Sequence, residues 1–191
     1  HKGLYGPQGT GLLLCGAEAS PLLYGGTGSA SRRQTMPIDL PDRLEAGTHN
    51  MPGIAGLLEG LRFVSHAGVE RIAQWERRLT RRAEEGLARL PGVEVFADKT
   101  GQGQTGVLSF CVKGMDCEQV GEELARRQIA VRAGLHCAPL AHSTAGTLET
   151  GTVRISPGWF QSVRQMRKFC DILAHICGKE SDQICDEVFT H

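Results

Sequence analysis

The chain has 191 residues, and its 21 basic and 21 acidic side chains give a formal net charge of zero. Such a balance offers no basic face of the kind that nucleic acid requires, so we expect no nucleic-acid partner. No apolar run approaches the roughly 20 residues that span a bilayer, and we therefore expect no membrane partner. The length suits one large domain or two small ones.

The first 50 residues are rich in Gly, Pro and Thr and contain one clear apolar run, at 12–15. This run predicts a buried strand, with Cys15 in the core. Ahead of it, Lys2 stands among Gly and Pro residues that can hold it on a turn. A desolvated lysine can form a Schiff base with an aldehyde, whereas a solvated lysine near a chain end is the commoner case.

Two helices are predicted next. Apolar residues recur at three- and four-residue spacing from Pro52 to Phe63, which indicates an amphipathic helix with Pro near its start. A second helix is predicted over 69–90, ended by Pro91 and Gly92. Arg and Glu alternate along it, which favours a solvated face rather than a binding patch. Its apolar stripe, which we expect in the core, consists of Ile72, Trp75, Leu79, Ala83, Leu87 and Leu90.

Beyond Gly92 the pattern changes to short strands alternating with helices, which indicates a compact α/β domain. We place the domain boundary near residue 91, so that the domains are 1–91 and 92–191. The predicted elements are strands at 93–97, 107–112, 129–132 and 152–156, with helices at 117–127 and 162–176.

The loop between the last two strands carries Cys137. Gly134 can end the preceding strand, and we expect Pro139 to prevent a helix directly after the cysteine. Reactive groups are often displayed on such loops. The neighbours that would favour a thiolate are Arg132, His136 and His142. Because a lone Cys is more often a small buried hydrophobe, the pattern alone leaves both interpretations open.

The chain has seven cysteines, an odd number that cannot pair completely, and it is too large to need disulfides for stability. No CxxC pair occurs, so a zinc site has little support and we expect no metal. Reduced thiols in a cytoplasmic protein fit this usage best.

Two segments, more than a hundred residues apart, match one family. His1-Lys2 followed by Tyr-Gly-Pro-Gln-Gly-Thr-Gly at 5–11 resembles the pyridoxal-phosphate (PLP) lysine segment of the cysteine desulfurases and selenocysteine lyases, in the class V aminotransferase-like superfamily. Residues 132–139 resemble the segment with that family's sulfur-accepting cysteine. Weaker matches lie at 25–29, 43–50 and 151–156.

The resemblance implies an α/β fold, the C-terminal half of a PLP-dependent enzyme of fold type I that begins at the cofactor lysine segment. Residues 1–91 would be the last part of the PLP-binding large domain, with a long connecting helix. Residues 92–191 would form the small C-terminal α/β domain that carries the catalytic cysteine loop.

The resemblance also implies a function, the conversion of L-cysteine to L-alanine with transfer of sulfur to Cys137 as a persulfide. PLP would be attached to Lys2, and His1 and Thr27 would contact its phosphate. The substrate carboxylate needs an arginine; on residues alone Arg154 and Arg132 are equal candidates, and the resemblance favours Arg154.

The partners implied are a second copy of the chain, since Thr27 would serve the other subunit's cofactor, and a sulfur-acceptor protein, as in iron–sulfur cluster assembly. Three alternatives stay open: a selenocysteine lyase, a class V aminotransferase, which has no use for Cys137, and a non-catalytic interaction domain.

Overall fold

The chain divides into two compact units after Gly68 in the computed structural model. The structure describes residues 1–101, 103–178 and 189. The helix after Gly68 lies with the C-terminal unit, whereas the sequence places the domain boundary near residue 91; that boundary stays a prediction. None of the described helices is both long enough and apolar enough to cross a membrane.

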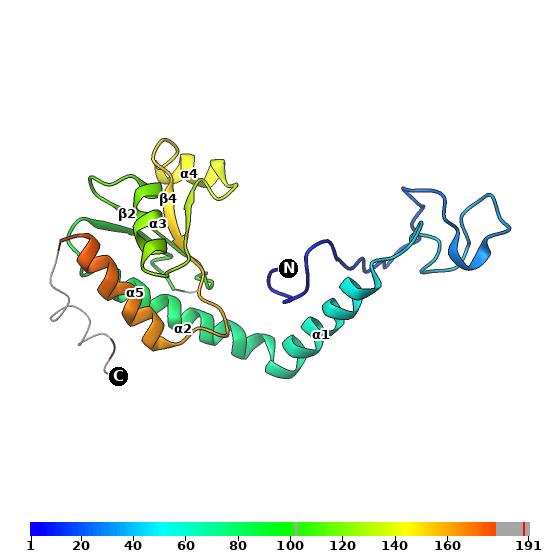
Figure 1. The fold of residues 1–191 in the computed structure, drawn as a ribbon, viewed down its shortest axis with the longest axis horizontal. Coiled ribbons are helices and arrows are strands. Elements are labelled where there is room, and N and C mark those ends of the chain that lie inside the picture. The colour runs from blue at the N-terminus through cyan, green and yellow to red at the C-terminus, as the bar shows by residue number, and fades with distance from the viewer. Residues whose placement is uncertain (102, 179–188, 190–191) are drawn as a thin grey trace. The chain divides into compact units, whose positions relative to one another are not determined.

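The first unit contains one long helix, α1 (Met51–Ala67), and a short 3₁₀ turn, η1 (Gly28–Ala30) (Figure 1). Asn50 caps α1, since its side chain accepts a hydrogen bond from the Gly53 N–H at 3.0 Å. Pro52 occupies the first turn, where its missing N–H costs nothing. The helix predicted from Pro52 onward is therefore confirmed.

The strand predicted at 12–15 is wrong. These residues have no regular structure, Leu14 is 93% exposed, and Cys15 is exposed rather than in the core. A strand requires a hydrogen-bonded neighbour, and every strand of the described residues lies in the second unit. The apolar run alone could not show whether such a neighbour exists.

A face of α1 made of glycines holds the N-terminal segment. A Cβ on Gly60 would lie 2.3 Å from the Leu4 carbonyl oxygen, and one on Gly56 would lie 3.2 Å from Pro7. Tyr5 packs edge-on against Phe63 with ring centroids 5.1 Å apart. The backbone just after Lys2 is therefore seated directly on the helix.

The second unit is a four-stranded antiparallel sheet with three helices on one face (Figure 1). The strand order is β1-β2-β4-β3. The strands are β1 (Val93–Phe96), β2 (Leu108–Val112), β3 (Arg132–Gly134) and β4 (Thr152–Ile155); the helices are α2 (Val69–Leu87), α3 (Cys117–Arg126), α4 (Pro139–Ala145) and α5 (Val163–Ile176).

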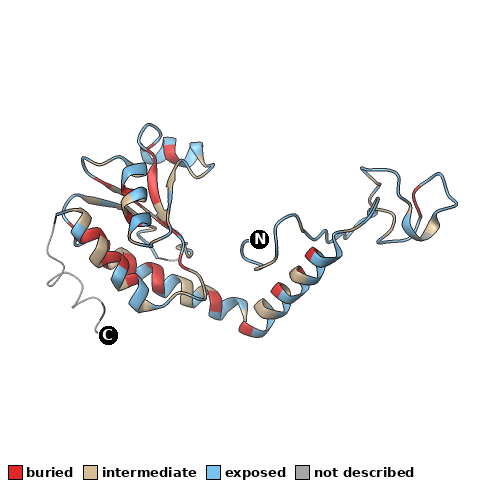
Figure 2. Ribbon diagram, viewed as in Figure 1, coloured by how far each residue is buried: buried red, intermediate tan, exposed pale blue. Residues whose placement is uncertain are grey.

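The core lies between the sheet and helices α2, α3 and α5, where Figure 2 shows the buried residues gathered. Phe110 on β2 and Phe169 on α5 meet there with ring centroids 5.9 Å apart. Trp75 also packs against this core, and its indole N–H donates to the Gln161 carbonyl at 3.1 Å. The stripe predicted on the second helix is thus confirmed as buried, only partly at Trp75, with Ile72 buried outside this core, and the helix ends at Leu87 rather than at residue 90.

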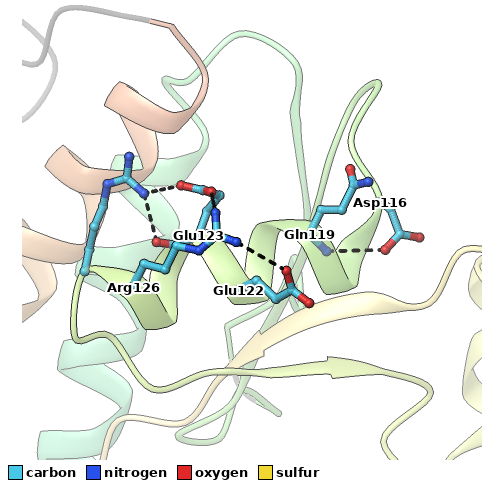
Figure 3. A network of polar contacts seen from close by, with 6 residues as sticks. Asp116, Gln119, Glu122, Glu123 and Arg126 are labelled. Carbon is cyan, nitrogen blue, oxygen red and sulfur yellow. Dashed lines mark hydrogen bonds and ion pairs between the residues drawn. The ribbon is translucent and has the colours of Figure 1, made fainter.

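Side chains fix where the helices begin. Asp116 caps α3, accepting from the backbone N–H groups of Glu118 and Gln119 at 2.8 and 3.4 Å. Figure 3 shows the part of this cap between Asp116 and Gln119 and the ion pair of Arg126 with Glu122 further along the helix. Glu123 forms ion pairs with Arg126 and Arg127. The hydrogen bond from Arg127 lowers the pKa of Glu123.

The strand predicted at 129–132 lies later, at 132–134. Continuing its register with β4 would place residue 129 opposite Pro157, which has no N–H to donate. Pro157 thus prevents pairing at 129, and residues 129–131 lie outside the ladder, although Ile129 and Val131 still pack against the core.

We expect Leu79→Ala to lower the free energy of unfolding of the second unit by about 2–5 kcal/mol, because Leu79 is 0% exposed in the core. Chemical denaturation would measure this change. The control is Leu140→Ala on α4, where the side chain is 83% exposed and the effect should stay below about 0.5 kcal/mol. Equal losses at both positions would contradict the described core.

Candidate active site

The pairing of β3 with β4 brings two arginines together. Arg132 lies directly opposite Arg154, and Gly134 lies opposite Thr152. Neighbouring residues of the same strands, Val153 among them, point to the helical layer. The two guanidinium groups therefore belong to the opposite, open face of the sheet.

A tight turn after β3 displays Cys137. Gly134 ends the strand with φ +100°, and the Ala138 N–H donates to the Leu135 carbonyl at 2.9 Å. His136 and Cys137 have φ of 53° and 59°, in the left-handed region. Non-glycine residues adopt that region at about 1–2 kcal/mol each, so surrounding contacts must hold the turn.

Pro139 does not prevent a helix after the cysteine, and that expectation is wrong. Helix α4 begins at Pro139 itself. Proline is unfavourable inside a helix but well suited to its first position, where its fixed φ is already helical. Cys137 thus stands two residues before a helix, at the tip of the turn.

The Cys137 thiol is exposed and lies beside Arg132. The Arg132 Nη2 donates to the Cys137 Sγ at 3.5 Å. A guanidinium next to sulfur favours the thiolate, the form that acts as a nucleophile. The structure thereby places Arg132 at the thiol, the role that the sequence pattern offered as one of two.

Arg154 has a free buried donor. Its Nε atom is buried and has no hydrogen-bond partner among the described residues, while the side chain as a whole is half-buried. A buried N–H without an acceptor is costly, and a carboxylate is the ligand that a guanidinium binds in a bidentate manner. Of the two arginines, Arg154 is the one left to receive an anion.

His136 connects the turn to β4. Its Nε2 lies 3.0 Å from the Thr152 hydroxyl oxygen, and its Nδ1 is buried without a partner among the described residues. Burial lowers the pKa of His136 from its ordinary 6.5, and the charges of Arg154, His142 and Arg132 lower it further, against the opposing effect of a hydrogen bond with the Thr152 backbone. His136 is thus held neutral.

His142 has a structural position behind this turn. It is buried on α4, its Nδ1 lies 2.8 Å from the Thr147 hydroxyl, and its ring centroid is 5.6 Å from that of His136. A small cavity of about 130 Å³ between α4 and the open face of the sheet is lined by His142, Thr147 and Thr152, among others. The sequence reasoning missed both threonines, because the β3–β4 register that brings Thr152 to His136 is known only from the structure.

The remaining predicted residues lie in the first unit. His1 and Lys2 are exposed. Lys2 begins a turn in which its own carbonyl accepts a hydrogen bond from the Tyr5 N–H at 2.9 Å. Thr27 is half-buried and its hydroxyl donates to the Ala30 carbonyl at 3.1 Å. The structure therefore groups Cys137, Arg132 and Arg154 in one unit, and His1, Lys2 and Thr27 in the other.

The other cysteines differ in setting from Cys137. Cys170 is buried in the core, and Cys111 is half-buried, with its pKa raised by burial first and then by Glu94 and Cys117. Cys15 and Cys117 have free thiols, as Cys111 and Cys137 do, and Cys185 lies outside the described residues. No group of three or more metal-ligating side chains occurs in the described part of the chain.

A family model described as "Aminotransferase class-V" matches residues 1–169. The chain belongs to this family. A probable cysteine desulfurase of Mycolicibacterium paratuberculosis is 38% identical over 88% of this chain and 25% of its own length. One from Methanothermobacter thermautotrophicus is 32% identical over 93% of this chain and 46% of its own length. The chain thus spans between a quarter and half of these class V relatives.

Solved structures confirm the α/β fold. An apo cysteine desulfurase from Thermococcus onnurineus superposes with a TM-score of 0.73 at 33% identity, over 83% of this chain and 39% of that one. The Escherichia coli cysteine desulfurase in its S-sulfonic acid form gives 0.70 at 28% identity, over 82% and 38%.

The lowered pKa of His136 predicts a pH dependence of stability. As pH falls below 6.5, the unfolded chain binds a proton at this residue before the folded chain does. Stability is therefore fully present above that pH and declines as pH drops toward the folded pKa. We expect His136→Gln to lose less melting temperature between about pH 7.5 and about pH 5.5 than the parent chain.

The control for this comparison is His175→Gln on α5, which makes the same chemical change at an exposed histidine away from the turn. Scanning calorimetry at both pH values gives the melting temperatures. An equal decline in parent and His136→Gln would contradict the lowered pKa of His136.

Proposed function

We propose that this chain contributes to a PLP-dependent cysteine desulfurase, which converts L-cysteine to L-alanine and receives the sulfur on Cys137 as a persulfide. The observation that carries the proposal is the exposed Cys137 thiol at 3.5 Å from Arg132, on the same face as the buried free donor of Arg154. The cysteine desulfurases among the relatives support it.

Two features of the first unit fit the cofactor. Lys2 offers an exposed primary amine on a turn, the group that condenses with an aldehyde. Thr27 has φ −69°, and Gly28 after it has a positive φ of 52°. A turn in which φ changes sign between successive residues can point their N–H groups into an anion-binding concavity, which suits a phosphate.

In the loaded enzyme, Lys2 would hold PLP covalently and move the proton at the substrate Cα, and His1 and Thr27 would contact the phosphate. PLP supplies an electron sink for bonds at that carbon. Arg154 would bind the substrate carboxylate through its free N–H donors. This contact would orient the substrate and leave its sulfur accessible to Cys137, whose thiol lies beside Arg132.

Cys137 then performs the sulfur step. Its thiolate attacks the substrate sulfur, a new S–S bond forms, and the substrate C–S bond breaks with its electron pair remaining on the carbon. Protonation of that carbon yields alanine, and the enzyme retains the persulfide. Arg132 stabilises the anionic sulfur before the attack and the persulfide after it.

We further infer a homodimer, in which Thr27 serves the partner subunit's cofactor, and a sulfur-acceptor protein, as iron–sulfur cluster assembly would require. The free thiols of Cys15, Cys111, Cys117 and Cys137 support a reducing, cytoplasmic location. The selenocysteine lyase, aminotransferase and interaction-domain alternatives remain distinguishable by the fate of sulfur at Cys137.

We expect Cys137→Ala to lower alanine formation from L-cysteine in the PLP-loaded enzyme by about two orders of magnitude or more. Mass spectrometry after one turnover should find the extra sulfur on Cys137 in the parent. Cys111→Ala is the matched control and should retain both activity and persulfide. Sulfur on Cys111 or Cys117, with Cys137→Ala fully active, would refute the proposal and favour the aminotransferase.

Arg154→Gln should raise KM for L-cysteine by roughly one to two decades, the effect of losing a charge-assisted hydrogen bond to substrate. Steady-state kinetics would measure it, with the exposed Arg164→Gln as control. If Arg132→Gln shows this KM effect and Arg154→Gln does not, the roles of the two arginines are exchanged.

A further inference from the structure

Thr152 occupies a special place next to the Cys137 turn. It begins β4 and is only 3% exposed. Its partner across the ladder is Gly134, the residue that ends β3 and opens the turn. Its hydroxyl lies on the open face, 3.0 Å from the Nε2 of His136. One side chain therefore joins the rigid sheet to the turn.

The turn needs such a contact. His136 and Cys137 are consecutive non-glycine residues in the left-handed region, a conformation that persists only when other interactions impose it. Within the turn itself, the Ala138 N–H donates a backbone hydrogen bond to the Leu135 carbonyl. The Thr152 contact is the side-chain bond that ties His136 directly to β4.

We propose that Thr152 is a positioning residue for Cys137. Its hydroxyl holds the His136 ring against β4, and this holds Cys137 in the conformation in which its sulfur accepts the hydrogen bond from Arg132. The role rests on the proposed function only in taking Cys137 as the sulfur acceptor. Neither Thr152 nor His136 takes part in the sulfur step itself.

The protonation state of His136 suits this structural task. A neutral imidazole has one protonated and one unprotonated nitrogen, and a hydroxyl both donates and accepts, so either tautomer of His136 can bond Thr152. His142 helps to lower the pKa of His136, and the contact of His142 with the Thr147 hydroxyl holds His142 in place. The contact therefore persists through the neutral pH range.

The test measures how fast iodoacetamide alkylates Cys137 near neutral pH, resolved by peptide mass spectrometry. Thr152→Val removes the hydroxyl and keeps the shape, and we expect the Cys137 rate to fall about three- to tenfold, as the loss of one hydrogen bond implies. Thr152→Ser keeps the hydroxyl and should stay within about twofold of the parent. Thr144→Val, an exposed threonine on α4, is the control for the same chemical change.

A second comparison shows whether Thr152 acts through Arg132. If it does, Thr152→Val should have little further effect in an Arg132→Gln background, because the contact that it positions is already gone. Independent, additive losses would overturn the proposal, as would an unchanged or faster rate in Thr152→Val alone. In the PLP-loaded enzyme the variant should lower kcat with L-cysteine and leave KM unchanged, since Arg154 keeps its donors.

Folding is monitored in the same experiment by Cys170, which is fully buried and should stay unreactive. If Cys170 becomes reactive in Thr152→Val, His136→Phe breaks the same contact from the other side and decides the question by the same rates. The alkylation rates require neither cofactor nor turnover. A failure of the proposed function, seen as persulfide elsewhere, is thus separable from a failure of this positioning role.

Discussion

The pairing of β3 with β4 is the constraint on which the candidate site depends. It sets two guanidinium groups opposite each other, Arg132 and Arg154, on adjacent strands. Like charges at directly opposed positions are unfavourable, so the apolar face of the same strands must offset the repulsion. Val153, fully buried on β4, supplies part of that offset from the helical side.

The surplus of positive charge explains what the open face can receive. One guanidinium already contacts the Cys137 sulfur and the other has a buried N–H without an acceptor among the described residues. A thiolate and a carboxylate are both anions, and each relieves part of the repulsion. The same charges disfavour a proton on His136, which can then serve as a neutral link between turn and strand.

Much of this arrangement could be predicted from the sequence. The periodicity of α1, α2 and α5 was sufficient to locate them, because amphipathic spacing reports the buried face directly. The position of Cys137 between strands and its basic neighbours also followed from local pattern. Local pattern failed at 12–15, where burial depends on partner strands, and at Pro139, where the same residue is compatible with a helix start.

The hydrogen bond between His136 and Thr152 could not be predicted from the sequence. Sixteen residues separate the two, and their meeting depends on the strand register and on the left-handed turn. Neither the φ of a histidine nor the register of a three-residue strand is encoded by composition or spacing. Such contacts become visible only when the backbone path is known.

The brevity of β3 has a consequence for the behaviour of the molecule in a crowded solution. It is an outer strand of the sheet, and outer strands present unpaired backbone groups on which other chains can assemble. Here only three residues are available, the first is an exposed arginine, and the backbone turns away at Gly134. The bend that displays the thiol thereby leaves a poor template for amyloid-like stacking at that edge.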